Sequence, residues 1–155
     1  MKKKVNRYKT SPFKQGTYRP VNRQKYVGAK LPEYRSSWEL KFFTWCDRNS
    51  NVLEWTSEST IVPYISPLDK RAHRYFVDNT LALKEGDNVK KYMVEIKPYK
   101  QTIPPDNSSR KKKSTLLYEH KTYAVNQAKW DAARKMAAKK GMEFIILTEK
   151  ELNIK

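Results

Sequence analysis

Four residues, EGDN at positions 85–88, place the strongest constraint on how this chain can fold. Gly86 supplies the backbone freedom that a tight connection needs. The segments on either side, AHRYFVDNTLAL before the turn and VKKYMVEIKP after it, have the composition of β-strands. The sequence therefore predicts an antiparallel hairpin. Two short strands, VLEWTSE and TIVPYIS, are predicted before it, and Pro63 in the second indicates a sheet edge or a bulge.

Helical patterns flank this meander of strands. A first helix is predicted to begin with Ser36 or Ser37 as its N-cap, and its apolar face places Cys46 in the core. A long second helix is predicted from about residue 116 to residue 140, with Gly141 as its C-cap. After it, MEFIILT is an uninterrupted apolar run, which is typical of a central buried strand.

The side of the long helix that meets the sheet has two possible assignments. A stripe of small and apolar residues is expected to approach the sheet closely, and the stripe on the opposite side is the alternative. The first stripe is Val125, Ala128, Ala132 and Met136; the second is Tyr123, Gln127, Trp130 and Arg134. A last short helix is predicted to begin near Thr148.

Charged residues occur inside the strand that follows the turn. Glu95 and Lys97 are two residues apart, so their side chains point to the same face of the strand. One interpretation is a solvent-facing salt bridge, which is common and contributes little to stability. The other is half of a metal-dependent phosphodiesterase site. Asp78, on the preceding strand, supplies a second carboxylate that could share a divalent cation with Glu95.

Net charge is the strongest global signal. The 155 residues contain 33 Lys and Arg against 16 Asp and Glu, a formal charge of +17, which indicates a polyanion-binding protein. No apolar segment has the length of a membrane span, so no membrane partner is expected. Cys46 is the only cysteine and His73 and His120 the only histidines, which argues against a Cys/His zinc site. Four glycines provide no phosphate-cradling loop.

Two basic segments are candidate nucleic-acid contacts. Residues 1–35 contain eleven Lys and Arg and one acidic residue, and they are interpreted as an extended binding arm ahead of a folded domain at 36–155. The loop QTIPPDNSSRKKKS carries four successive cations. A solubilising tail and a solvated charge run are the alternatives. The candidate contacts are Lys2, Lys3, Lys4, Arg7, Lys9, Lys14, Arg19, Arg23, Arg110, Lys111, Lys112 and Lys113.

Taken together, an Asp, a Glu-x-Lys on the next strand and a preceding helical Glu resemble the PD-(D/E)XK nuclease superfamily. Within it, the chain is similar to the head-completion nucleases of T-even-type phages and, more distantly, to the transposon endonuclease subunit that shares their catalytic domain. The matching segments are RYKTSPFKQGTY, KYVG, YRSSWELKFFTWCD, VLEWTSE, VEIKP and NQAKW…AAKKGMEFIILTE. One departure is Val77, where the motif has proline before Asp78.

The resemblance implies an α/β restriction-endonuclease-like mixed sheet flanked by helices. It also implies a catalytic set of Glu39, Asp78, Glu95 and Lys97, in which the three carboxylates bind Mg²⁺, with Mn²⁺ as a substitute. Gln127 is a further candidate from the following helix, with a plain surface role as its alternative. For Glu39, stabilisation of the helix dipole is the alternative. Asp47, Asp69 and Asp87 are interpreted as turn or surface carboxylates.

The implied function is DNA cleavage at the phage portal after genome packaging. DNA and portal or neck proteins would be the partners, in the virion head region and in the host cytoplasm during assembly. Two other functions remain open on the sequence. One is a non-catalytic head-completion protein that binds DNA ends or the portal, and the other is a basic RNA-binding or ribosome-associated protein.

Overall fold

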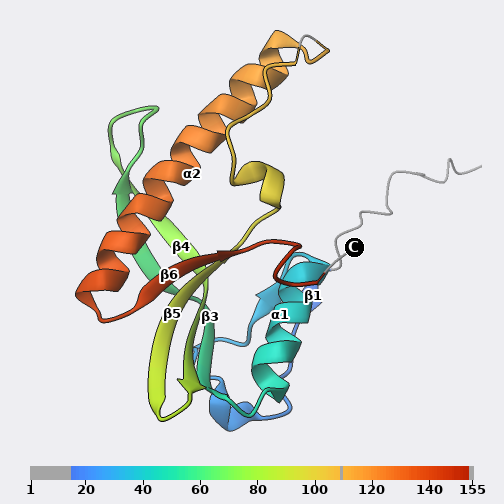
Figure 1. Ribbon diagram of the computed structural model, residues 1–155, viewed down its shortest axis with the longest axis vertical. Coiled ribbons are helices and arrows are strands. Elements are labelled where there is room, and N and C mark those ends of the chain that lie inside the picture. The colour runs from blue at the N-terminus through green and yellow to red at the C-terminus, as the bar shows by residue number, and fades with distance from the viewer. Residues whose placement is uncertain (1–14, 109, 154–155) are drawn as a thin grey trace, which may run out of the picture.

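A four-stranded mixed sheet forms the centre of the protein, with one helix on each face (Figure 1). The computed structural model describes residues 15–108 and 110–153. The strand order is β3-β4-β5-β6, in which β3, β4 and β5 are antiparallel neighbours and β6 runs parallel to β5. The predicted α/β architecture, a mixed sheet flanked by helices, is confirmed at this level.

The hairpin predicted around Gly86 is confirmed. β4 spans Ala72–Glu85 and β5 spans Asn88–Ile96. Gly86 has a φ of 61°, the left-handed backbone conformation that favours glycine in a tight turn. The two strands predicted before it are a single 14-residue strand, β3 (Val52–Ile65), because a register shift between Ser57 and Thr60 accommodates an extra residue without ending the strand. β3 lies at the edge of the sheet, as Pro63 indicated.

The first helix begins where the sequence predicts. α1 spans Ser37–Arg48, and the Ser36 hydroxyl accepts a hydrogen bond from the Glu39 N–H. Its inner face packs on one side of the sheet in a core cluster that includes Phe43, Cys46 and Trp55. The predicted core position of Cys46 is confirmed.

The second helix packs on the other side of the sheet. α2 spans Lys113–Lys139, and Trp130, Ala133 and Ala137 join β-strand residues in the second core cluster. The expectation that the stripe of Val125, Ala128, Ala132 and Met136 meets the sheet is confirmed only in part, because Ala132 and Met136 pack against this cluster as partly buried residues. The fully buried residues of α2 are Asn126, Trp130, Ala133 and Ala137, and among them only Trp130 belongs to a predicted stripe, the alternative one.

The segment after α2 corrects two expectations. β6 (Glu143–Leu147) is an edge strand rather than a central one, and its apolar character arises because both helices cover its two faces. Residues 149–153 form turns rather than the predicted short helix. No helix in the described part of the chain is long and apolar enough to cross a membrane.

Residues 15–35 pack against the domain instead of standing apart from it, which corrects the extended arm over this stretch. They form the short pair β1 (Gly16–Thr17) and β2 (Glu33–Tyr34) and the 3-10 turn η1 (Arg23–Lys25). The physical reason is that aromatic side chains of the segment, Tyr18 and Tyr26, pack around Trp55. The first 14 residues of the predicted arm lie outside the described residues.

Asp47 anchors this segment and is not the surface carboxylate that was expected. It is fully buried, and it accepts hydrogen bonds from the Tyr18 hydroxyl and from the N–H groups of Val21 and Asn22, all at 2.7–2.8 Å. Three donors converge on one carboxylate, so the segment is joined to the end of α1 by a buried polar contact as well as by aromatic packing.

Candidate active site

Asp78 lies where β4 separates from β5. The ladder between the two strands ends at the pair Asn79 and Val94, and the next position in the same register places Asp78 beside Glu95. Beyond this point the Ile96 N–H donates to Asp78 Oδ2 at 2.8 Å instead of to a β4 carbonyl. The Asp78 carboxylate thus satisfies the Ile96 N–H group, which has no β4 carbonyl to bond where the strands separate.

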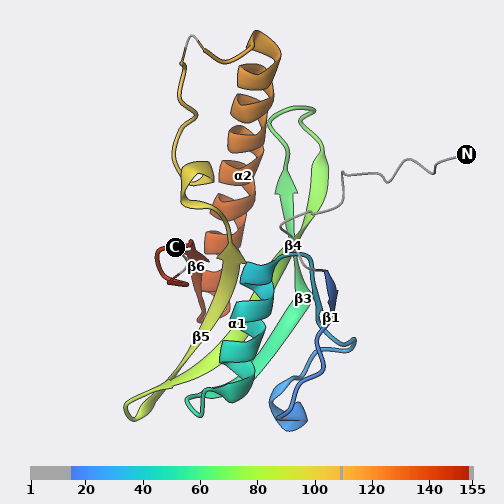
Figure 2. The ribbon, with the colours of Figure 1, turned by 90° about the vertical axis from the view of Figure 1, so that its right-hand side faces the viewer.

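An irregularity in the neighbouring strand β3 lies opposite this point of separation. The register shift between Ser57 and Thr60 lies opposite Asp78 in β3, and Glu58 within it has a φ of 49°. On one side of the shift the β3 and β4 residues Trp55 and Leu81 pack with α1. On the other side Val62, Tyr75 and Val77 pack with α2. The outer halves of β3 and β4 therefore rise beside α2 as a two-stranded arm (Figure 2). Asp78 lies at the base of this arm, because β4 pairs with β5 only from Asn79 onward.

Glu95 is a buried carboxylate with both oxygens engaged. The Tyr75 hydroxyl donates to Oε2, and Lys97 Nζ lies 3.4 Å from Oε1. The Glu95 side chain is only 6% exposed and that of Lys97 is 27% exposed. The interpretation of this pair as a solvent-facing salt bridge is therefore wrong, and the same-face geometry predicted from the strand period is confirmed.

The electrostatics of the two carboxylates favour a cation. Desolvation, followed by the negative charge of Glu95, raises the pKa of Asp78 well above its ordinary value. The Ile96 N–H and Lys97 oppose this shift without cancelling it. Two hard oxygen donors that destabilise each other's charge are a donor set that a divalent cation such as Mg²⁺ fits.

Glu39 lies near this pair but is engaged elsewhere. Its charge contributes to the raised pKa of Asp78, after the larger effect of Glu95. Its Oε2 accepts from the Arg35 N–H at 2.6 Å, and its N–H is bonded to the Ser36 hydroxyl, an arrangement that closes the N-terminus of α1. Among residues 15–108 and 110–153, no three His, Cys, Asp or Glu side chains are close enough together to hold a metal ion. The donor set that the structure brings together is thus Asp78 and Glu95.

The α2 helix contributes a residue that the sequence interpretation missed. Lys129 Nζ lies 5.6 Å from the centroid of the Tyr75 ring and 5.9 Å from that of Tyr64. No local sequence pattern identifies Lys129, because its position beside Tyr75 depends on how α2 packs on the sheet. Gln127, the predicted helix residue, is half-buried and has no hydrogen bond to the site within the described part of the chain, so its role stays a prediction.

The predicted DNA-binding residues fall into separate places. Arg19 and Arg23 are exposed on the N-terminal segment. Arg110, Lys112 and Lys113 are exposed at the start of α2, whereas Lys111 pairs with Glu119 at 2.9 Å. At 1.5 Å per residue the start of α2 is roughly 24 Å from Lys129, so this basic loop is remote from the carboxylate pair. The remaining candidates, Lys2, Lys3, Lys4, Arg7, Lys9 and Lys14, lie outside the described residues.

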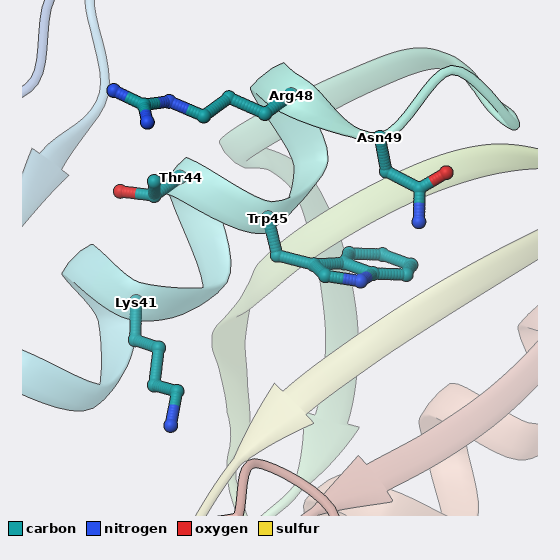
Figure 3. A pocket seen from close by; sticks show the side chains of 5 residues that line it. All are labelled: Lys41, Thr44, Trp45, Arg48 and Asn49. Atoms are coloured by element: carbon teal, nitrogen blue, oxygen red, sulfur yellow. The ribbon is translucent and has the colours of Figure 1, made fainter.

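Hollows on the α1 side of the sheet do not include the carboxylate pair. A shallow depression is lined by Lys41, Thr44, Trp45, Arg48 and Asn49, and the indole of Trp45 points away from Thr44 and Arg48 (Figure 3). A neighbouring groove is lined mainly by apolar side chains, with Trp45 and Lys41 shared between the two.

Known proteins match most of this fold. The N-terminal domain family of TnsA-like endonucleases matches residues 49–149, a stretch that contains every strand of the four-stranded sheet together with α2. The chain belongs to the TnsA-like endonuclease family. Asp78, Glu95, Lys97, Gln127 and Lys129 all fall inside the matched stretch, and Glu39 falls outside it.

A phage protein matches a larger part of this chain than the family model does. The head completion nuclease of Enterobacteria phage T4 is 38% identical over 138 residues, which cover 86% of this chain and 90% of the relative. The resemblance to phage head-completion nucleases that was inferred from the sequence is confirmed by this match.

Proposed function

We propose that this TnsA-like protein is a divalent-metal-dependent DNA endonuclease that acts in phage head completion. The observation that carries the proposal is that half-buried Asp78 and buried Glu95 lie side by side at the point where β4 leaves β5, with Lys97 in contact with Glu95. Two carboxylates held close together and largely away from bulk water destabilise the folded state unless a cation compensates them. A functional requirement for a metal accounts for an arrangement that stability does not favour.

Each side chain has a role that follows from its position. Asp78 and Glu95 would hold Mg²⁺ or Mn²⁺, and the bound ion would supply charge neutralisation of the phosphate and a lowered pKa for a bound water. Lys97 would orient the attacking water and stabilise the charge that develops on the phosphate. Tyr75 would fix the orientation of Glu95 through its hydrogen bond. Glu39 would act from the start of α1 as an acceptor for water around the ion.

The biological setting follows from the relative's description as a head completion nuclease. The substrate would be packaged DNA at the portal, cleaved after genome packaging and before tail attachment. Portal or neck proteins would be the partners, in the head region of the virion and in the host cytoplasm during assembly. The charge of +17 supports DNA as the ligand.

Cleavage of plasmid DNA tests the proposal. Purified protein should nick or linearise supercoiled DNA with Mg²⁺ or Mn²⁺ and leave it intact with EDTA. Glu95→Gln should abolish this activity, and Glu143→Gln is a matched control because Glu143 is an exposed carboxylate on the neighbouring strand β6. Metal-independent cleavage, or full activity of Glu95→Gln, would contradict the proposed site.

A non-catalytic protein that binds DNA ends or the portal is the second candidate. The high positive charge supports it as well as it supports an enzyme. The same assay separates the two, because a purely structural protein would retard DNA in a gel without cleaving it under any metal condition.

A further inference from the structure

We propose that Lys129 is a positioning residue that binds a phosphate of the DNA strand beside the scissile bond. This inference rests on the proposed endonuclease function and adds a residue to its site. Lys129 lies on α2, over the ring of Tyr75, whose hydroxyl is bonded to Glu95.

The side chain of Lys129 is held in place by two aromatic rings. Its Nζ lies over Tyr75 at 5.6 Å and over Tyr64 at 5.9 Å from the ring centroids. The Tyr75 hydroxyl is bonded to Glu95, so one side chain both orients the carboxylate and supports the lysine. A lysine fixed in this way loses less conformational entropy when it binds a ligand than a lysine free in solvent.

Lys129 is a cation without an anionic partner in the described structure. Lys97 contacts Glu95 at 3.4 Å, whereas Lys129 forms no ion pair with a carboxylate among residues 15–108 and 110–153. Burial, and then the positive charge of Lys97, lower the pKa of Lys129, and the charges of Glu95 and Asp78 oppose that effect only in part. Two ammonium groups near one another and partly desolvated are compensated when an anion binds between or beside them.

A DNA phosphate is the anion that this geometry fits. A divalent cation bound by Asp78 and Glu95 would neutralise these carboxylates, so their negative charge would no longer stabilise the ammonium groups of Lys97 and Lys129. The negative group that remains to be bound at the site is the substrate backbone. A compact ammonium on a long stem is a common phosphate contact and does not read base identity. Lys129 is therefore expected to position the DNA strand relative to the carboxylate pair without conferring a sequence preference.

The test compares Lys129→Met with Lys135→Met. Methionine keeps an unbranched apolar stem over Tyr64 and Tyr75 and removes only the charge. Lys135 is an exposed lysine on the same helix, so its substitution gives the same change in net charge. Single-turnover cleavage of a duplex with saturating protein and Mg²⁺ should fall about 10–100-fold for Lys129→Met. The Lys135→Met rate should stay within about twofold of the wild type, and Lys129→Arg should recover part of the loss because it restores a phosphate-binding cation.

Metal-free duplex binding provides a second readout. Removal of one phosphate-binding cation should make the slope of log affinity against log salt shallower by about 0.9 for Lys129→Met and leave it unchanged for Lys135→Met. Equal effects from both substitutions, a wild-type rate for Lys129→Met, or a slower rate without a change in slope would overturn the proposal. If the wild type cleaves no DNA, the proposed function fails, and the salt slope alone decides whether Lys129 contacts a phosphate.

Discussion

The hydroxyl of Tyr75 donates a hydrogen bond to the buried carboxylate of Glu95, and this bond joins the two-stranded arm of β3 and β4 to the end of β5. The two residues are 20 positions apart along the chain. The arm is thereby connected to the candidate metal site through a side chain as well as through the backbone at Asp78.

Tyr75→Phe should impair cleavage while keeping the fold. The phenylalanine ring can keep the packing of Tyr75, but Glu95 loses one of its two partners and becomes less well oriented. Removing such an outer partner of a metal ligand typically reduces activity or metal affinity by about 10–100-fold. Cleavage rates measured across a Mg²⁺ titration would show the loss. Tyr64→Phe is the matched control, since Tyr64 packs nearby without a bond to Glu95. A wild-type metal dependence for Tyr75→Phe would contradict the orienting role.

Lys97→Ala should act mainly on the chemical step. If Lys97 stabilises the developing charge, its loss should lower the single-turnover rate by about 10²–10³-fold at saturating Mg²⁺. Lys97→Arg should recover little, because a planar guanidinium does not replace a compact ammonium in a confined site. Removing the cation beside a buried carboxylate should also lower the free energy of unfolding by about 1–3 kcal/mol. The cleavage rates should therefore be measured well below the melting temperature of the variants. Equal rates for all three proteins would remove Lys97 from the mechanism.

Asp47→Asn should destabilise the protein in a pH-dependent way. Burial alone would raise the pKa of Asp47, but the hydrogen bonds from Tyr18, Val21 and Asn22 together hold it below its ordinary value. A carboxyl with a lowered pKa in the folded state stabilises the protein above its unfolded-state pKa, and this contribution is lost as the pH falls through the folded-state value. At pH 7 the variant should be less stable by about 1–3 kcal/mol. Between pH 7 and pH 3 the difference in melting temperature from the wild type should narrow. A constant difference would show that the carboxylate charge is not what these donors stabilise.

Removing residues 1–14 should weaken DNA binding without disturbing the packed segment. The deletion takes away six basic and no acidic residues and lowers the formal charge from +17 to +11. Duplex affinity should fall, and its salt dependence should become shallower by about 0.9 for each phosphate that these residues neutralise in the full-length protein. An unchanged slope would assign these residues to a protein partner or to solubility.

A longer deletion, of residues 1–30, provides the contrast. It also removes Tyr18 and Tyr26, which pack around Trp55, and the donors to Asp47. The melting temperature should therefore drop for this deletion and stay near the wild-type value for the deletion of residues 1–14. Equal melting of both truncated proteins would contradict the packing of residues 15–30 on the domain.

The parts of the site that local periodicity controls could be predicted from the sequence. The strand period placed Glu95 and Lys97 on one face, and the turn at Gly86 brought Asp78 to the neighbouring strand. Both depend on contacts between residues close in sequence. Lys129 could not be found this way, because its place at the site depends on how a helix of 27 residues docks on the sheet.

The incorrect predictions share a cause in tertiary packing. The N-terminal segment has no local period, yet Tyr18 and Tyr26 pack around a tryptophan that the sequence places far downstream. An apolar edge strand such as β6 has the same composition as a central one when helices cover both faces. The buried Asp47 likewise has its partners 25–29 residues away, beyond the range of a motif.

The hairpin that carries the two carboxylates has a consequence for the order of folding. Asp78 and Glu95 lie on the two strands of one antiparallel hairpin and Lys97 directly follows its second strand, so a short chain loop brings the three together. β6 can join β5 only after the long excursion through α2, a connection of high contact order that closes late. We expect the acidic pair to assemble early and Lys129 to arrive with the docking of the helix. In a newly made chain the two mutually repelling carboxylates would then be close together before Lys129 reaches them, and the proposed site would be complete only after α2 has docked on the sheet.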